Sequence, residues 1–298
     1  MNNYRDKKGS WFPKEFTEKT VTKAVEDNIK RKQSRINDVV IVDGIPLFSW
    51  VELNVNELCN RECVFCPRSQ GYPNKNVHMD AAAAELIASQ LDDLKFRGSV
   101  NISGTGEPLL TKHIADIVKP FGDRNIPIEI TTNGDKLKHK LIEELYQAGL
   151  AQLVISMYDG PHQIEYFTNM LESAGVHSSL YTLRDRWYDK EDDYGLMYTN
   201  RAGWLGKNLP NPKKGACYYP HYTFFIDWNG DILLCCHDMY NRTETFGNIK
   251  DLPLIDLWKN QRLIQFRKKL KAGDRSESPC NNCTANGVVL GRLHVELW

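Results

Sequence analysis

The sequence lacks an excess of charge of either sign. Its 298 residues include 38 Lys and Arg residues and 38 Asp and Glu residues, so the formal net charge is zero. No long run of one sign occurs, and binding to nucleic acid or to an anionic membrane usually needs a broad positive field. We therefore expect no nucleic-acid partner and no membrane partner.

Long apolar runs are also missing. No window approaches the roughly 18 consecutive apolar residues of a transmembrane helix. The N-terminal segment MNNYRDKKGSWFPKEF has no uninterrupted apolar stretch behind its positive charges, so it does not have the pattern of a secretory signal. We expect a cytoplasmic protein. In a reducing cytosol, its eight cysteines are better explained by metal binding than by disulfides.

The middle of the chain alternates between short β-branched runs and helical stretches. Strands are predicted at SWVELNV, GSVNIS, IPIEITT and AQLVISMY, and helices near 80–96, 111–121 and 136–148. This rhythm is typical of an α/β fold with a parallel sheet, in which sites lie at the carboxyl ends of the strands. The preceding residues are highly charged, with a helical pattern at Val21, Ala24, Val25 and Ile29.

The pattern changes beyond about residue 200. Two β-like runs in TFFIDWNGDILLCC meet at Asn229-Gly230, which is a strong signal for a β-hairpin. A helix is predicted around Leu254 to Leu270, and the segment PCNNC follows. We therefore divide the chain into an N-terminal extension (1–45), an α/β core (46–203) and a small C-terminal module (204–298).

Three cysteines follow the first strand of the predicted core. Cys59, Cys63 and Cys66 form a C-x3-C-x2-C array in ELCNRECVFCPR. Three thiolates from one loop can bind three irons of a [4Fe-4S] cluster, which leaves the fourth iron without a protein ligand. The alternatives are a zinc site short of one ligand and a ferredoxin-like cluster with a distant fourth cysteine, but structural zinc sites prefer four protein ligands.

This array, with the aromatic Phe65 before its last cysteine, resembles that of the radical S-adenosylmethionine superfamily. The resemblance implies a partial (β/α)6 TIM-like barrel, in which the open iron binds the amino and carboxylate groups of S-adenosylmethionine. Reduction of the cluster then cleaves this cofactor to methionine and a 5′-deoxyadenosyl radical, which takes a hydrogen atom from the substrate. A flavodoxin- or ferredoxin-type protein is the expected electron donor.

The segment SGTGEPLL is similar to the glycine-rich motif of the same family. Gly104 and Gly106 allow the backbone to approach a ligand closely, and Glu107 offers an acceptor for the cofactor's ammonium group. Thr105 stands where the usual Gly-Gly-Glu has its first glycine. We predict that Gly104, Gly106 and Glu107 bind the cofactor.

Polar residues also follow the third and fourth predicted strands. Asn133 and Ser156 lie where the family binds the ribose and carboxylate groups of the cofactor, so both, like Phe65, are predicted to be cofactor-binding residues. The alternative is that Asn133-Gly134 and the Asp-Gly pair after Ser156 merely form turns.

The C-terminal module holds the other cysteines. Cys217, Gly230 and Cys235 have the spacing of the C-x(9-15)-G-x4-C signature of the SPASM and shorter twitch domains of radical enzymes. The resemblance implies that Cys280 and Cys283 complete the ligands of one auxiliary [4Fe-4S] cluster. No cysteine follows Cys283, so the one-cluster twitch type fits better than a full SPASM domain. A structural zinc ribbon is the alternative.

Two adjacent cysteines compete for one of these ligand positions. The glycine spacing selects Cys235, and Cys236 would then point to the opposite face of its strand. Either thiolate is a competent ligand, so the choice stays open. His237 and Asp238, which follow, are interpreted as turn residues.

The resemblance implies an oxidoreductase. A second cluster with four protein ligands has no vacancy for substrate, and in dehydrogenases of this type it accepts an electron while an alcohol becomes a ketone. We predict oxidation of a secondary alcohol of a small molecule, a sugar or aminocyclitol. Arg201, between core and module, is the candidate catalytic residue for substrate binding or proton removal, with an interdomain salt bridge as its alternative role. Candidate pocket residues are Tyr158, Tyr198 and Trp204.

Two other functions are considered. A peptide- or protein-modifying SPASM oxidase often carries an N-terminal peptide-recognition domain, for which the extension looks too short. A non-catalytic iron-sulfur electron carrier would explain the cysteines, but it would not explain Glu107 or the open iron.

Overall fold

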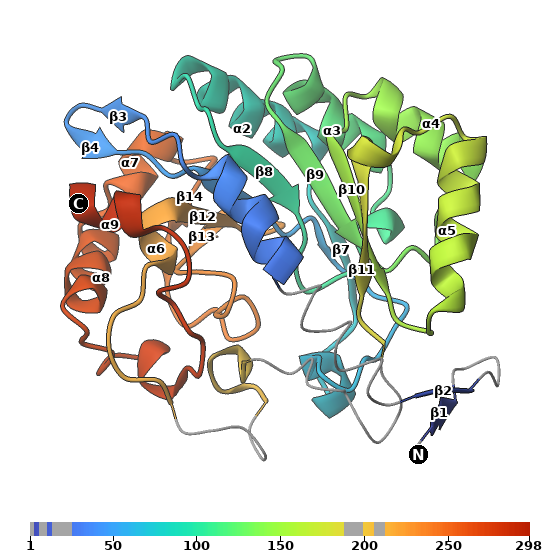
Figure 1. Cartoon of the computed structure of the whole chain (residues 1–298). Coiled ribbons are helices and arrows are strands. Elements are labelled where there is room, and N and C mark those ends of the chain that lie inside the picture. The colour runs from blue at the N-terminus through green and yellow to red at the C-terminus, as the bar shows by residue number, and fades with distance from the viewer. Residues whose placement is uncertain (1–2, 6–10, 14–25, 188–198, 206–211) are drawn as a thin grey trace.

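A parallel β-sheet with helices on one face forms the centre of the chain (Figure 1). The computed structural model describes residues 3–5, 11–13, 26–187, 199–205 and 212–298. Five parallel strands lie side by side in chain order: β5 (Trp50–Leu53), β8 (Ser99–Ile102), β9 (Ile128–Thr132), β10 (Gln152–Met157) and β11 (Tyr181–Asp185). The predicted α/β class is thereby confirmed, and β11 is a strand that the sequence pattern missed.

Helices connect these strands and cover one face of the sheet. They are α2 (Ala81–Asp93), α3 (Ile114–Gly122), α4 (His139–Gln147) and α5 (His162–Ser173). In α2, the side chain of Asp80 accepts a hydrogen bond from the backbone N–H of Ala82 and so caps the helix. The predicted apolar stripe is buried at Ala83, Ile87 and Leu91, which pack in the main core.

The sheet continues without a break into the C-terminal region. Strand β12 (Thr223–Ile226) pairs in parallel with the free edge of β5, and β13 (Asp231–Leu233) and β14 (Thr245–Asn248) follow in antiparallel pairing. Gly230 has a φ of +93° and forms the predicted hairpin turn. Core and module therefore share one eight-stranded sheet, and the boundary at 203/204 stays a prediction.

The prediction of a single helix around Leu254 to Leu270 was wrong. The structure has two helices there, α7 (Leu254–Trp258) and α8 (Gln261–Lys271). The side chain of Asn260 accepts hydrogen bonds from the backbone N–H groups of Arg262 and Leu263 at 2.9 and 3.2 Å. Because Asn favours N-cap positions, it begins a new helix at this point.

The remaining elements are short. The strands are β1 (Asn3–Arg5), β2 (Trp11–Pro13), β3 (Ile41–Val42), β4 (Ile45–Pro46), β6 (Asn56–Glu57) and β7 (Lys75–His78), and the α-helices are α6 (Tyr219–Tyr222) and α9 (Arg292–Leu297). The 3-10 helices are η1 (Pro67–Gln70), η2 (Pro108–Leu110), η3 (Ser178–Leu180), η4 (Arg201–Gly203) and η5 (Cys280–Asn282). No helix within the described ranges is long and apolar enough to cross a bilayer.

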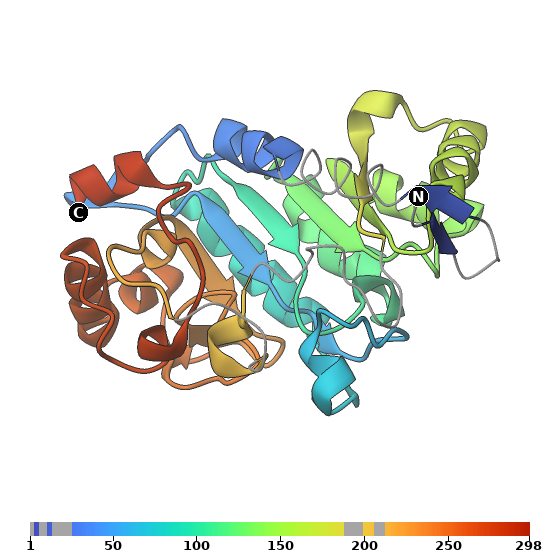
Figure 2. The ribbon, with the colours of Figure 1, turned by 60° about the horizontal axis from the view of Figure 1, so that its bottom comes forward.

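A helix at residues 26–35 lies over the sheet face opposite to α2–α5, as Figures 1 and 2 show. An ion pair joins Arg31 to Glu129, and Lys32 Nζ lies 3.2 Å from Glu52 Oε1. Ile29 packs against the cluster around Trp50. The predicted helical positions 21, 24 and 25 lie outside the described residues.

Candidate active site

The loop with the first three cysteines follows β6 and is held at the carboxyl ends of β9 and β10. Arg61 donates from Nε to Asp135 Oδ2 at 2.6 Å and from Nη1 to Asp159 Oδ1 at 2.9 Å. Burial lowers the pKa of Arg61, but the bonds to Asp159 and Asp135 outweigh it, and the pKa lies above its ordinary value. A charged guanidinium therefore fixes the loop beside the sheet.

A second buried arginine holds the other side of the loop. Arg68 donates from Nε to the carbonyl oxygen of Thr105 at 3.0 Å and from Nη1 to Asn74 Oδ1 at 3.0 Å. Asn74 Oδ1 also accepts from the backbone N–H of Cys59 at 2.8 Å. The sequence analysis missed both arginines, although they lie within and directly after the cysteine array.

The glycine-rich loop approaches two asparagines that follow β5. A Cβ atom on Gly104 would lie 2.0 Å from Asn54 Oδ1, and one on Gly106 would lie 1.6 Å from Asn56 Oδ1. Asn54 Nδ2 donates to Thr105 Oγ1 at 3.2 Å, and its Oδ1 accepts from the backbone N–H of Thr105. The departure from Gly-Gly-Glu therefore has a structural reason, because Thr105 replaces a glycine with a hydrogen-bonding partner for Asn54.

Glu107 is buried beneath this loop and contacts the end of β9. Its carboxylate accepts hydrogen bonds from the backbone N–H groups of Asn133 (2.8 Å) and Leu109 (3.0 Å) and from Thr132 Oγ1 (2.5 Å). Burial raises the pKa of Glu107 to about 7 despite these bonds. A carboxylate offers about four acceptor sites, so one is left for an ammonium group. The structure thus brings Glu107 and Asn133 together.

A cavity of about 510 Å³ is lined by residues of helix 26–35 and of the sheet face that this helix covers. Its volume is within the usual range for a ligand site. Four predicted site residues line it, namely Phe65, Gly104, Ser156 and Arg201, as does Tyr158. Gly106, Glu107 and Asn133 are not among the lining residues. Trp204 packs against Tyr72 instead, and Tyr198 lies outside the described residues.

The four cysteines predicted for the auxiliary cluster line a second, smaller cavity. They are Cys217, Cys235, Cys280 and Cys283. Cys236 lines the large cavity instead. The prediction that the two lie on opposite faces of a strand was wrong, because β13 ends at Leu233. The carbonyl oxygen of Cys235 accepts a hydrogen bond from the backbone N–H of Asp238, so the chain turns at Cys236.

The two cavities share a wall. Tyr219, His237 and Ala285 line both of them, while Arg201 lines the large cavity and the adjacent Ala202 lines the small one. His237 and Asp238 lie in a turn, as predicted. Arg201 and Ala202 have φ values of 49° and 51°, a strained left-handed conformation that often occurs at functional sites.

The described residues contain no preformed site for a single metal ion. No group of three or more His, Cys, Asp or Glu side chains in that part of the chain is arranged to hold one. A structural zinc site would need four ligands converging on one point, whereas each thiolate of an iron-sulfur cubane binds a different iron. The cysteine-lined cavity therefore fits a cluster better than it fits zinc.

A partly buried polar network, which the sequence analysis missed, joins the C-terminal module to the first cysteine region. Arg242 donates from Nε to Asp227 Oδ2 at 2.5 Å and from Nη1 to the Tyr72 hydroxyl at 2.6 Å, and this hydroxyl donates to Glu57 at 2.6 Å. The Tyr72 ring contacts Tyr240 with centroids 4.9 Å apart. The Tyr240 hydroxyl lies 3.6 Å from the Cys66 sulfur.

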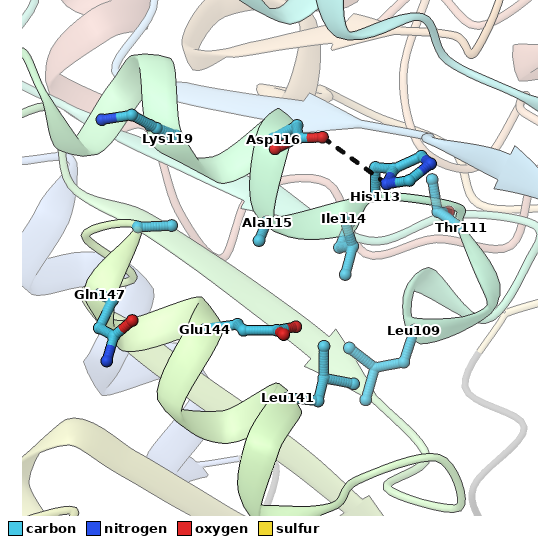
Figure 3. Close-up of a pocket in the computed structure, with 11 residues that line it drawn as sticks. Leu109, Thr111, His113, Ile114, Ala115, Asp116, Lys119, Leu141, Glu144 and Gln147 are labelled. Carbon is cyan, nitrogen blue, oxygen red and sulfur yellow. Dashed lines mark ion pairs between the residues drawn. The ribbon is translucent and has the colours of Figure 1, made fainter.

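Another hollow, of about 540 Å³, lies between α3 and α4 on the side of the sheet away from helix 26–35 (Figure 3). Leu109, Ile114 and Leu141 supply apolar side chains, and Asp116 and Glu144 supply carboxylates. None of its lining residues is a predicted site residue. This hollow is therefore separate from the candidate active site.

Family models match both parts of this arrangement. Residues 53–169 match the model described as "Radical SAM superfamily", and residues 217–284 match SPASM, an "Iron-sulfur cluster-binding domain". The chain belongs to the radical S-adenosylmethionine superfamily and carries a SPASM-type domain. It is 32% identical over 244 residues to the S-adenosyl-L-methionine-dependent 2-deoxy-scyllo-inosamine dehydrogenase of Niallia circulans. This match covers 80% of this chain and 93% of that enzyme.

Solved structures give the same result. The crystal structure of BtrN in complex with AdoMet and 2-DOIA has a TM-score of 0.69 and 29% identity, covering 83% of this chain and 97% of that one. BtrN in an open conformation has a TM-score of 0.60 and 25% identity, covering 82% and 95%. The predictions of a radical enzyme, of its fold, and of iron-sulfur clusters with S-adenosylmethionine as cofactors are confirmed.

Proposed function

We propose that the protein is a dehydrogenase that oxidises a secondary alcohol of a sugar or aminocyclitol to a ketone. The observation that carries this proposal is the shared wall: a ligand-sized cavity adjoins the four-cysteine cavity through Tyr219, His237 and Ala285. A substrate in the large cavity would lie next to an electron acceptor in the small one. The relative from Niallia circulans, a dehydrogenase by name, supports the same reaction type.

The cysteine roles follow from where the thiols lie. Cys59, Cys63 and Cys66 are proposed to hold the first cluster, next to Phe65 in the cavity wall. The four cysteines around the small cavity are proposed to hold the auxiliary cluster: Cys217, Cys235, Cys280 and Cys283. Cys236 then belongs to the substrate side of the wall.

The bound cofactor supplies the hydrogen-atom abstraction, and the protein positions the reactants. Phe65, Gly104 and Ser156 form part of the wall against which the cofactor would lie. Glu107 is proposed to accept a hydrogen bond from the cofactor's ammonium group through its remaining acceptor site. Asn133 helps indirectly, since its backbone N–H orients the Glu107 carboxylate.

Arg201 is proposed to bind the reacting alcohol and to favour loss of its hydroxyl proton. It lines the substrate cavity while its neighbour Ala202 lines the cysteine cavity, so the guanidinium would lie near the carbon that loses its electron. A positive charge there stabilises a developing alkoxide. A flavodoxin- or ferredoxin-type protein is proposed as electron donor for the first cluster, and the cytosol as the place of reaction, because such clusters need reducing conditions.

S-adenosylmethionine cleavage tests this function. The anaerobically reconstituted protein, reduced with dithionite, should form 5′-deoxyadenosine, and Cys63→Ala should not. Substrates would be sought among sugars and cyclitols, including 2-deoxy-scyllo-inosamine, by the appearance of a ketone in equal amount to 5′-deoxyadenosine. Arg201→Gln should retain cofactor cleavage but lose most ketone formation. Formation of 5′-deoxyadenosine together with a modified peptide, and without a ketone, would instead support the peptide-modifying alternative.

A further inference from the structure

The large cavity has a marked excess of positive charge. Five cationic side chains line it, from the N-terminal helix, from β11 and its end, and from η4: Arg31, Lys32, Arg184, Arg186 and Arg201. A single carboxylate, that of Glu52, is among the lining residues. The chain as a whole has zero net charge, so this concentration of one sign is local.

Two of these cations are neutralised within the protein. Arg31 forms an ion pair with the buried Glu129, and Lys32 pairs with Glu52. Their charges are therefore used to attach helix 26–35 to the sheet. The Glu52 carboxylate therefore already has a cationic partner. Its Oε1 also accepts a hydrogen bond from Trp50 Nε1 at 3.0 Å.

Arg184 and Arg201 differ from this pair. Neither side chain has an ion pair or a hydrogen bond to any of the described residues, and Arg184 Nε is buried without a partner. Arg184 lies on β11 directly beside Ser156 of β10 in the strand register. Burial, together with repulsion from Arg186, lowers the pKa of Arg184 to about 9. A buried guanidinium of this kind is stabilised by an anion that binds next to it.

The cofactor accounts for only one of these two arginines. S-adenosylmethionine has a single carboxylate, one oxygen of which would bind the open iron, and its sulfonium group is itself positive. When that carboxylate pairs with one guanidinium, the other still faces the cavity. An amine substrate, such as the inosamine in the name of the Niallia circulans enzyme, would be repelled by it.

Building on the proposed function, we infer that the alcohol substrate of this enzyme carries an anionic group, a phosphate ester or a carboxylate, which pairs with Arg201, while the cofactor's carboxylate pairs with Arg184 beside Ser156. The site therefore favours an acidic sugar or cyclitol over a basic one. Selection comes from repulsion as well as from attraction, because an unpaired buried charge opposes a second positive charge.

Equilibrium binding to the reconstituted, unreduced holoenzyme tests this inference without turnover. Glucose, glucosamine, glucose 6-phosphate and inorganic phosphate would be titrated by calorimetry in the presence of saturating S-adenosylmethionine. Glucose 6-phosphate and phosphate should bind, glucosamine should bind at least tenfold more weakly than glucose 6-phosphate, and added salt should reduce the difference. Charge-assisted hydrogen bonds of this kind correspond to about a ten- to hundredfold change in affinity.

Variants separate the two sources of negative charge. Arg184→Gln should weaken S-adenosylmethionine binding, and Arg201→Gln should weaken glucose 6-phosphate binding to the cofactor-loaded enzyme, each about tenfold or more. Arg124→Gln, which removes a surface arginine paired with Glu85, is the control and should change neither affinity.

Three results would overturn the inference. They are equal or tighter binding of glucosamine, absence of binding by both phosphate and glucose 6-phosphate, and an anion affinity that both cavity variants leave unchanged. Failure of the proposed function has a different signature, because an enzyme that forms no 5′-deoxyadenosine upon reduction can still show the preference for anions.

Discussion

Replacement of each of two neighbouring cysteines by alanine tests the site, because their side chains line different cavities. Cys235 lies with Cys217, Cys280 and Cys283, whereas Cys236 lines the cavity that holds Phe65 and Ser156. Cys235→Ala should therefore remove the auxiliary cluster. Cys236→Ala makes the same change in atoms one residue away and should leave that cluster in place.

The expected magnitude is a loss of half the iron. Two [4Fe-4S] clusters hold about eight iron atoms per chain, so Cys235→Ala should retain about four and Cys236→Ala about eight. The first cluster is held by a separate loop, which the bonds of Arg61 and Arg68 fix independently of the small cavity. Reduced Cys235→Ala protein should therefore still cleave S-adenosylmethionine, although without coupled ketone formation.

Iron and sulfide quantification after identical anaerobic reconstitution provides the main measurement, with electron paramagnetic resonance of the reduced proteins to count the clusters. Cys280→Ala serves as a positive control, since its thiol lines the same small cavity. The reasoning is refuted if Cys236→Ala loses half of the iron, or if Cys235→Ala retains all of it. A full complement of zinc in place of iron would refute the cluster assignment itself.

Three further predictions follow from single contacts. Arg242→Gln leaves the buried Asp227 carboxylate without its cation and should reduce the free energy of unfolding by about 3 kcal/mol in anaerobic urea titrations; an unchanged midpoint would contradict this. Burial lowers the pKa of His294 to about 4, so its contribution to stability is lost as pH falls from 6.5 towards 4. His294→Gln should lessen the stability loss between pH 7 and pH 5 by about 2 kcal/mol, and an equal loss would count against it. Gly106→Ala would place a Cβ 1.6 Å from Asn56 Oδ1 and should weaken S-adenosylmethionine binding in calorimetry, and unchanged affinity would show that the loop tolerates the shift.

Much of the fold was predictable because its signals are local. The alternation of β-branched runs and helices is written in consecutive residues, as is the Asn229-Gly230 turn. Pairing of β12 with β5 was not predictable in this way, since it joins segments more than 150 residues apart. The break at Asn260 was missed because the apolar pattern continues on both sides of it.

The site shows the same division. The resemblance to SPASM and twitch domains predicts which thiols belong together, and the structure brings Cys217, Cys235, Cys280 and Cys283 around one cavity. The glycines of SGTGEPLL were expected to admit a ligand, yet both also admit asparagine side chains from the segment that follows β5. A glycine in the sequence indicates that another group approaches the backbone closely, but only the tertiary structure shows which group it is.

The N-terminal helix connects these observations to substrate choice. Glu52 and Glu129 are buried carboxylates on the inner face of the sheet, and without Lys32 and Arg31 they would remain as unpaired negative charges in the cavity region. Such charges would attract a basic substrate and would offset the positive charge of Arg184. By neutralising both carboxylates, helix 26–35 leaves the unpaired guanidiniums to determine the local electrostatic field. Helix 26–35, which the sequence analysis placed outside the catalytic core, is therefore proposed to contribute to the positive charge that the active site presents.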